Sequence, residues 1–319
     1  MKRKINTIIN RCLTILALLL LAAGLAMIQY PNVCQHLYKR KAEQIISDYQ
    51  DRLEEYTGPQ PESGGGEWDW LYEMIVQYNE ELYENGQSSL VDAFSYQQVG
   101  FGLVRFGFDE EMIGYLSIPK MGIELPIYLG ANRENMANGA AHLTQTSLPV
   151  GGINTNAVFA AHRGMSTAAM FRNIEELEAG DEVLVTNFRE TLTYRVAETA
   201  VIDPADIDAI LIQKDRDLVT LITCHPYRYN YQRYVVYCER VTETGNESDE
   251  SGEKNGERNG QAVVTGLRTI FRYAEMSKSQ QRIFLEYWIP VGITVLLIIL
   301  AAVLMVFKRK KRNAPNYNI

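Results

Sequence analysis

The sequence predicts a mainly β protein, in which a closed or nearly closed β-barrel follows N-terminal helices and is flanked by two transmembrane helices. Short apolar runs separated by turn residues occupy positions 114–241, a pattern typical of barrels built from many short strands. Uncharged stretches of 19 and 21 residues lie near the two ends of the chain, at 12–30 and 287–307. At about 1.5 Å per helical residue, each is long enough to cross the hydrocarbon layer of a membrane.

The distribution of charge predicts the orientation in the membrane. Lys and Arg residues flank both uncharged stretches on their terminal sides, at 2–11 and at 308–312. Because positive residues favour the cytoplasmic side, both termini are expected in the cytoplasm and the barrel outside the cell. The alternative for the first stretch is a cleaved signal peptide, since Gly24-Leu-Ala26 offers small residues for cleavage. The net charge of -8, from 31 basic and 39 acidic residues, argues against a nucleic-acid partner.

Two helices are expected between the first membrane stretch and the strands. Residues 37–56 and residues 68–83 each align apolar side chains at helical spacing, and the first of these helices is expected to pack on the barrel. A linker rich in Gly and Pro, 58–66, separates them, and Glu84-Asn-Gly86 ends the second. The aligned residues are Ala42, Ile45, Ile46, Tyr49, Leu53 and Tyr56 in the first helix and Leu71, Ile75, Tyr78 and Leu82 in the second.

The strands are predicted from short runs rich in apolar and β-branched residues, bounded by turn signals. They cover 115–118, 123–128, 157–161, 182–187, 191–199, 218–223 and 233–241, with a short helix at 168–177. After the last strand the chain becomes polar and lacks large apolar side chains, which predicts a disordered tether.

The predicted divisions of the chain follow from these features. They are a cytoplasmic N-terminus (1–11), a transmembrane helix (12–30), an extracellular helical region (31–89), a segment that leads into the barrel (90–113), the barrel (114–244), a disordered linker (245–260), a juxtamembrane segment (261–286), a second transmembrane helix (287–307) and a basic cytoplasmic tail (308–319).

Three reactive side chains are expected to meet at strand ends. Cys224 lies where the strand 218–223 stops at His225-Pro226, and Arg233 opens the next strand after a loop that returns the chain antiparallel. His162 directly follows the strand 157–161. A thiol nucleophile, an imidazole that transfers protons and a guanidinium that stabilises an oxyanion are the components of a thiol acyl-transfer site.

The remaining cysteines and histidines suggest no further chemistry. Cys238 lies about 17 Å beyond Arg233 at ~3.4 Å per strand residue, outside the ~7 Å range of a disulfide with Cys224, so Cys224 is expected to be a free thiol. His142 is expected to be a hydrogen-bonded support, and His225 to point away from the site. No spacing of His, Cys, Asp or Glu predicts a metal site, and no glycine-rich phosphate loop is present, so neither a metal nor a cofactor is expected.

Several of these motifs resemble those of sortases, the membrane-anchored cysteine transpeptidases of Gram-positive bacteria. The segment Thr220-Leu-Ile-Thr-Cys224 is similar to their cysteine signature, Arg233 stands at the spacing of their arginine, and Ala161-His-Arg-Gly164 resembles their histidine motif. The resemblance implies an eight-stranded sortase barrel. It further implies that Cys224 attacks the Thr carbonyl of a sorting signal like Leu-Pro-x-Thr-Gly (LPxTG), that His162 transfers protons, and that Arg233 stabilises the tetrahedral intermediates.

Residues 90–94 resemble the lid of class C sortases, which polymerise pilins and carry there the pattern Asp-Pro-aromatic. Ala93 replaces the Pro, whereas Asp92 and Phe94 retain the two side chains that the lid uses. The resemblance implies that Asp92 pairs with Arg233 and that Phe94 covers Cys224. An ordinary loop with a buried Phe is the alternative. A C-terminal membrane helix is also frequent in class C, so pilus assembly with a pilin lysine as acceptor is expected.

Two other functions stay open at this point. A sortase that anchors surface proteins to peptidoglycan would differ only in the acceptor amine. A non-catalytic membrane scaffold would keep the barrel without the chemistry, although the intact Cys, His and Arg argue against it. The expected partners are therefore pilins or surface proteins with an LPxTG-like signal, an acceptor lysine of a pilin subunit or a peptidoglycan amine, and the membrane.

Overall fold

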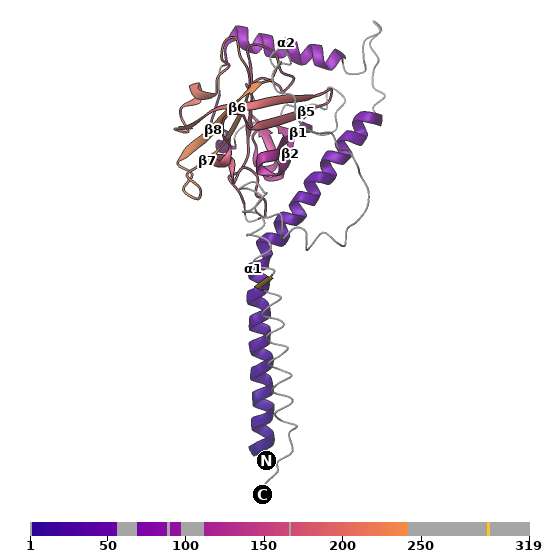
Figure 1. The fold of residues 1–319 in the computed structure, drawn as a ribbon, viewed down its shortest axis with the longest axis vertical. Helices are drawn as coiled ribbons and strands as arrows, with labels where there is room; N and C mark the ends of the chain where they lie inside the picture. Colours follow the sequence, from indigo (N-terminus) through magenta and orange to yellow (C-terminus); the bar gives the residue numbers. More distant parts are fainter. Residues whose placement is uncertain are drawn as a thin grey trace, which may run out of the picture.

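A closed barrel of eight strands lies near the end of the molecule opposite the N-terminus (Figure 1). The computed structural model describes residues 2–55, 69–87, 90–96, 112–165, 167–241 and 292–293. Around the barrel the strands follow the order β1-β2-β3-β4-β7-β8-β6-β5, with β1 pairing β5 to close it. The pairs β2/β3 and β4/β7 are parallel and the other pairs are antiparallel. The strands are β1 (Met112–Ile118), β2 (Ile123–Leu129), β3 (Ala140–His142), β4 (Thr155–Ala160), β5 (Glu182–Asn187), β6 (Thr191–Ile202), β7 (Asp217–His225) and β8 (Gln232–Arg240).

The eight-stranded barrel expected from the sequence is confirmed, with differences in two segments. The short strand β3 was not predicted, and neither was the helix α3 (Arg133–Asn138) before it. The predicted helix at 168–177 is wrong, because only the 3₁₀ helix η4 (Ile174–Glu176) forms there. The amide of Phe171 donates to the carbonyl of His162 instead of to a helical partner. The amides of Arg172 and Ile174 donate to the carbonyls three residues earlier, as in a 3₁₀ turn. This segment is therefore tied to the strand end that carries His162.

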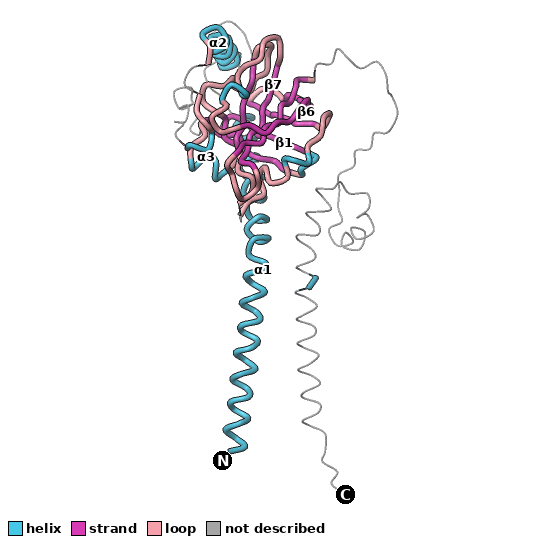
Figure 2. The backbone as a smooth tube through the Cα atoms, turned by 90° about the vertical axis from the view of Figure 1, so that its left-hand side faces the viewer, coloured by secondary structure: helices cyan, strands magenta, loops and turns pink. Residues whose placement is uncertain are grey.

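Helix α1 (Lys2–Glu55) joins the predicted membrane stretch and the predicted packing helix into one element. Figures 1 and 2 show the barrel near one end of α1 and the N-terminus at the other. Among the described residues, Thr14–Glu54 is the one helical segment long and apolar enough to cross a membrane. Pro31 lies inside α1 and lacks the amide that a helix interior uses, which favours the bend visible in Figure 1.

The C-terminal half of α1 packs on the barrel, as expected from its apolar face. Ile46 and Tyr49 are buried in a cluster with Met112 of β1. The Tyr49 hydroxyl donates to the Ile113 carbonyl at 3.1 Å, and the Tyr38 hydroxyl donates to the Asn138 carbonyl at 2.9 Å. Apolar burial and these polar contacts fix the barrel against the C-terminal half of α1.

Helix α2 (Asp69–Asn85) packs on a different part of the barrel, with Leu71, Ile75 and Leu82 buried as the spacing predicts. The buried Asn79 was not expected among these apolar positions. Its side-chain amide donates to the Leu148 carbonyl at 3.0 Å, and its side-chain oxygen accepts from the Leu148 amide at 2.8 Å. This two-way pairing joins α2 to the loop before β4.

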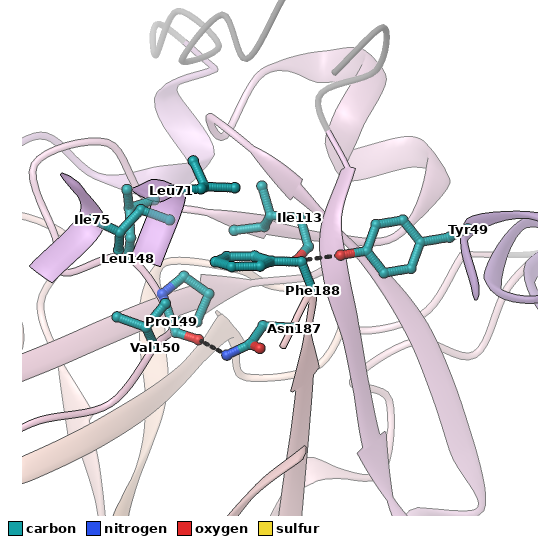
Figure 3. Close-up of a pocket in the computed structure, with 9 residues that line it drawn as sticks. All are labelled: Tyr49, Leu71, Ile75, Ile113, Leu148, Pro149, Val150, Asn187 and Phe188. Atoms are coloured by element: carbon teal, nitrogen blue, oxygen red, sulfur yellow. Dashed lines mark hydrogen bonds between the residues drawn. The ribbon is translucent and has the colours of Figure 1, made fainter. Parts of the chain in front are cut away.

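A small pocket marks the junction of α1, α2 and the barrel (Figure 3). Most of its lining is apolar, with Leu71 and Ile75 of α2 facing Phe188 after β5. Its polar groups bond within the protein, since the Asn187 side chain donates to the Pro149 carbonyl at 2.9 Å. The pocket is therefore a packing junction between the helices and the barrel.

Two apolar clusters lie on the two faces of the curved sheet. One fills the barrel interior with residues such as Phe159, Leu221 and Val236. The other covers the outer face of the neighbouring strands β4, β7 and β8 and includes Val158, Ile222 and Val235. Adjacent residues in a strand point to opposite faces, so this alternation decides which side chains can meet at the strand ends.

Several predictions concern residues outside the described ones. They are the linker 58–66, the tether 245–260, the juxtamembrane segment 261–286, the second membrane helix 287–307 apart from residues 292–293, and the basic tail 308–319.

Candidate active site

Cys224 and Arg233 lie directly opposite each other on the antiparallel strands β7 and β8. Residues paired in this way point to the same face of a sheet. Their neighbours Ile222 and Val235 belong to the outer cluster, so the thiol and the guanidinium share that outer face. Cys224 is a partly exposed free thiol, whereas Arg233 is buried.

His162 reaches the same place from β4, the parallel neighbour of β7. The last paired residues are Ala160 and Ile222, so His162 and Cys224 each follow two residues later. Beyond the pairing, the Ala161 amide donates to the Ile222 carbonyl at 3.3 Å, and the Thr223 hydroxyl donates to the Ala161 carbonyl at 2.7 Å. The final Thr of the cysteine motif thus ties the strand of the thiol to the strand of the imidazole.

The glycine that ends the histidine motif is required by the backbone. Gly164 has a φ of +87°, and a Cβ there would lie 2.6 Å from Nε of Arg172. A side chain would be both strained and obstructed. Gly164 therefore allows the chain to turn sharply after His162.

The segment around the 3₁₀ helix η1 (Ala93–Ser95) contacts Arg233 and His162. Asp92 accepts two hydrogen bonds from Arg233, one from Nε at 2.8 Å and one from NH2 at 2.6 Å. Ala93 is fully buried in the outer cluster. This two-point ion pair and buried residue fix the segment over the site.

Two aromatic rings of this segment enclose the imidazole. The rings of Phe94 and Tyr96 each lie 6.2 Å from the ring of His162, measured between centroids. The Arg233 guanidinium lies over the Phe94 ring at 4.9 Å, and the Arg133 guanidinium lies 5.5 Å from the Tyr96 ring. Phe94 thus contacts the two groups that flank Cys224, and Tyr96 is a further component that the sequence reasoning missed.

The covered site favours uncharged forms of the two reactive groups. Burial raises the pKa of the Cys224 thiol to about 11; Arg233 lowers that pKa, Asp92 raises it, and Arg163 lowers it. Burial also lowers the pKa of the His162 imidazole. At neutral pH the covered arrangement is therefore a thiol beside a neutral imidazole.

His142 and Cys238 have the surroundings expected from the sequence. The His142 ring is buried, with Nε2 2.9 Å from the Ser147 carbonyl and 3.1 Å from the Thr146 hydroxyl, as expected for a hydrogen-bonded support. Cys238 is buried, free and paired with Val219 of β7, five positions from Cys224. In the described part of the chain, no cluster of His, Cys, Asp and Glu could hold a metal ion.

The sortase domain model matches residues 116–241, which span the barrel from β1 to the end of β8. Sortase D of Bacillus subtilis is 32% identical over 132 residues, which are 40% of this chain and 64% of that protein. The chain thus spans less than two thirds of the length of this relative.

Solved structures match over a larger part of the chain. Sortase C from Clostridium perfringens is 32% identical with a TM-score of 0.50, and the match covers 62% of this chain and 99% of that one. Sortase C of Streptococcus pneumoniae, whose description concerns catalysis and pilin substrate specificity, is 29% identical with a TM-score of 0.55; that match covers 64% of this chain and 99% of the other. These matches extend beyond the barrel, since the barrel alone is a smaller share of the chain.

Proposed function

The chain belongs to the sortase family, with class C sortases among its structural neighbours, and we propose that it is a membrane-anchored cysteine transpeptidase that polymerises pilins. The observation that supports this most strongly is the arrangement of Cys224, Arg233 and His162 at three strand ends, covered by Asp92 and Phe94. The cover supports a class C enzyme in particular, because it pairs the proposed oxyanion donor with a carboxylate of the same chain.

In the proposed reaction the Cys224 thiolate attacks the Thr carbonyl carbon of an LPxTG-like sorting signal. Arg233 donates to the oxyanion of the tetrahedral intermediate. As the Thr–Gly bond breaks, the His162 imidazolium gives its proton to the departing Gly amine, and a thioester to Cys224 remains.

The second half of the reaction reverses the roles of the groups. A lysine amine of a pilin subunit attacks the thioester carbonyl, and neutral His162 accepts the proton that the amine loses. The carbon–sulfur bond breaks, an amide forms between the two subunits, and the thiolate is restored. A peptidoglycan amine would follow the same steps, so the acceptor is what separates the two sortase functions.

The test uses the full-length chain in detergent, a sorting-signal peptide and a lysine-containing pilin peptide. Mass spectrometry should show a thioester on Cys224 and an isopeptide-linked product, both absent from Cys224→Ala. His162→Ala and Arg233→Ala should each lower kcat/KM by at least ~100-fold, the scale for losing a proton-transfer group or an oxyanion donor. Transfer to a peptidoglycan stem peptide in place of the pilin lysine would favour anchoring, and wild-type turnover by Cys224→Ala would refute the proposal.

The proposed location places the barrel outside the cell membrane and both termini in the cytoplasm. The apolar segment within Thr14–Glu54 supports one anchor, and the basic residues that flank both uncharged stretches support the orientation. Protease added to intact protoplasts should remove the barrel and leave tags at both termini intact. A barrel that survives this treatment would contradict the orientation.

A further inference from the structure

Each of the three proposed catalytic residues is followed in sequence by a residue that belongs to a second group of side chains. These followers are Arg163 after His162, His225 after Cys224 and Tyr234 after Arg233. Adjacent residues in strands point to opposite faces. Accordingly, Tyr234 packs against the interior cluster, whereas the site lies on the outer face with the other cluster.

The three followers contact one another. NH1 of Arg163 lies 2.7 Å from Nδ1 of His225. The rings of His225 and Tyr234 are 5.7 Å apart, and the Arg163 guanidinium lies 5.9 Å from the Tyr234 ring. A set of three mutually contacting side chains thus lies behind the three catalytic residues and joins the same three strand ends.

A carboxylate completes the cluster. Glu175, from the 3₁₀ helix after the histidine motif, accepts from NH2 of Arg163 at 2.5 Å and lies 3.2 Å from Nδ1 of His225. The Arg163 side chain is 4% exposed, so its charge depends on these partners for compensation. The cluster of Arg163, Glu175, His225 and Tyr234 is called the rear cluster below.

The rear cluster also touches the catalytic strand end directly. NH1 of Arg163 lies 3.5 Å from the carbonyl oxygen of Cys224. Since a guanidinium only donates, Nδ1 of His225 is the acceptor in the Arg163 contact. His225 thus orients the Arg163 guanidinium, which also faces the backbone carbonyl of Cys224.

We propose that the rear cluster positions the catalytic residues, with His225 and Glu175 orienting Arg163 so that the strand ends bearing His162, Cys224 and Arg233 keep their mutual distances. Its members are positioning residues, because they act through the backbone of their neighbours. This inference rests on the proposed transpeptidase function. Loss of the cluster should slow the chemical step and leave the binding of the sorting signal unchanged.

The first test compares His225→Leu with His225→Asn in the full-length chain. Leu removes the acceptor for Arg163, whereas the Asn side-chain oxygen stands near the place of Nδ1 and can accept. His225→Leu should lower kcat with the sorting-signal peptide by about 10- to 100-fold, the scale of a small misplacement of reacting groups, with KM within about threefold. His225→Asn should restore most of kcat. Equal kcat in His225→Leu and wild type, or an equal loss in both variants, would overturn the proposal.

A second variant avoids the risk that a change at His225 impairs folding. Glu175 is half exposed, so Glu175→Ala should fold, and it removes the partner of Arg163 from the other side. The matched control is Glu178→Ala, a nearby exposed carboxylate that pairs with Lys120. Glu175→Ala should lower kcat at unchanged KM and Glu178→Ala should not. Equal values in these two variants would count against the rear cluster.

A measurement without substrate separates this inference from the proposed function. In a lid-opened background, Asp92→Ala with Phe94→Ala, alkylation of Cys224 by iodoacetamide is followed by peptide mass spectrometry. Adding His225→Leu should slow this alkylation severalfold, and adding His225→Asn should not. If the wild-type chain forms no thioester, the proposed transpeptidase function is refuted, and the alkylation rates still test the positioning role of the rear cluster. If the enzyme is active and His225→Leu leaves alkylation unchanged, only the positioning role is refuted.

Discussion

Removing the Asp92 carboxylate should open the lid, and the structure sets the size of the effect. The two hydrogen bonds from Arg233, at 2.8 and 2.6 Å, link side chains that are 8% and 19% exposed. Hydrogen bonds to charged groups contribute ~1.5–3 kcal/mol when largely shielded from water. A loss of about 2 kcal/mol raises the open population roughly 30-fold, since 1.4 kcal/mol corresponds to a factor of ten.

Phe94 adds a second contribution. Its ring contacts the Arg233 guanidinium and the His162 ring and is partly buried. Part of the ~1.5–3 kcal/mol for a fully buried large side chain is therefore lost in Phe94→Ala. The double variant, Asp92→Ala with Phe94→Ala, should open more often than either single variant.

The assay is the rate of iodoacetamide alkylation of Cys224 at fixed pH in the full-length chain, with the modified residue identified by mass spectrometry. If closed molecules do not react and the lid moves faster than the reaction, the observed rate is proportional to the open population. Asp92→Ala should react roughly 10- to 100-fold faster than wild type, by the same conversion. Asp206→Ala removes an exposed carboxylate elsewhere and should react like wild type. Equal rates for Asp92→Ala and wild type would show that the ion pair does not close the site.

Three further outcomes follow from the same contacts. The alkylation of Cys224 should reach half its maximal rate at a lower pH in the double lid variant, because opening removes burial and a carboxylate that both raise the thiol pKa. Tyr96→Ala should speed alkylation by about 2- to 5-fold, the scale of losing one exposed cation–π contact with Arg133. Asn79→Leu should lower the free energy of unfolding in urea by about 1–3 kcal/mol, because it leaves the buried amide of Leu148 unpaired and removes one of two hydrogen bonds to the Leu148 carbonyl, which also accepts from the Val150 amide.

Each of these outcomes has a result that would contradict it. An unchanged or higher pH midpoint in the lid variant would mean that the cover does not control the protonation of the thiol. Wild-type alkylation in Tyr96→Ala would limit the lid to Asp92 and Phe94. For Asn79→Leu the matched control is Gln77→Ala, an exposed position on α2 whose side chain bonds within the helix. Equal stability of these two variants would contradict a stabilising role of the pairing between Asn79 and Leu148.

Local spacing was enough to predict the strand ends but not the connections between them. Arg233 could be placed opposite Cys224 because a short loop between two apolar runs returns the chain antiparallel, and the observed register agrees. Strand β3 has three residues, all of them buried, and pairs in parallel with β2. It is therefore too short and too uniformly buried to show an alternation of apolar and polar residues. The helix predicted at 168–177 failed because a long-range bond from Phe171 to His162 replaced a helical one.

The components missed by the sequence analysis share one property, which is that their partners are distant in sequence. Tyr96 lies beyond the lid motif, and its place in the site is defined by its contacts with His162 and Arg133. Asn79 occupies an apolar face and is explained only by Leu148. In contrast, two members of the rear cluster could have been found, because strand alternation puts His225 and Tyr234 on the face opposite Cys224 and Arg233.

The closed lid affects both the charge and the access of the site. In the closed state Asp92 accepts hydrogen bonds from the Arg233 guanidinium, which the proposed reaction would use to stabilise the oxyanion. Burial and Asp92 both raise the pKa of Cys224 and so favour the protonated thiol. The aromatic rings that bury His162 favour its neutral form, whereas the first proton transfer requires the imidazolium. Displacing one short segment would therefore free the oxyanion donor, ease formation of the thiolate and ease protonation of the imidazole at once. Because these changes share one cause, a sorting signal that displaces the lid would activate the chemistry by the act of binding.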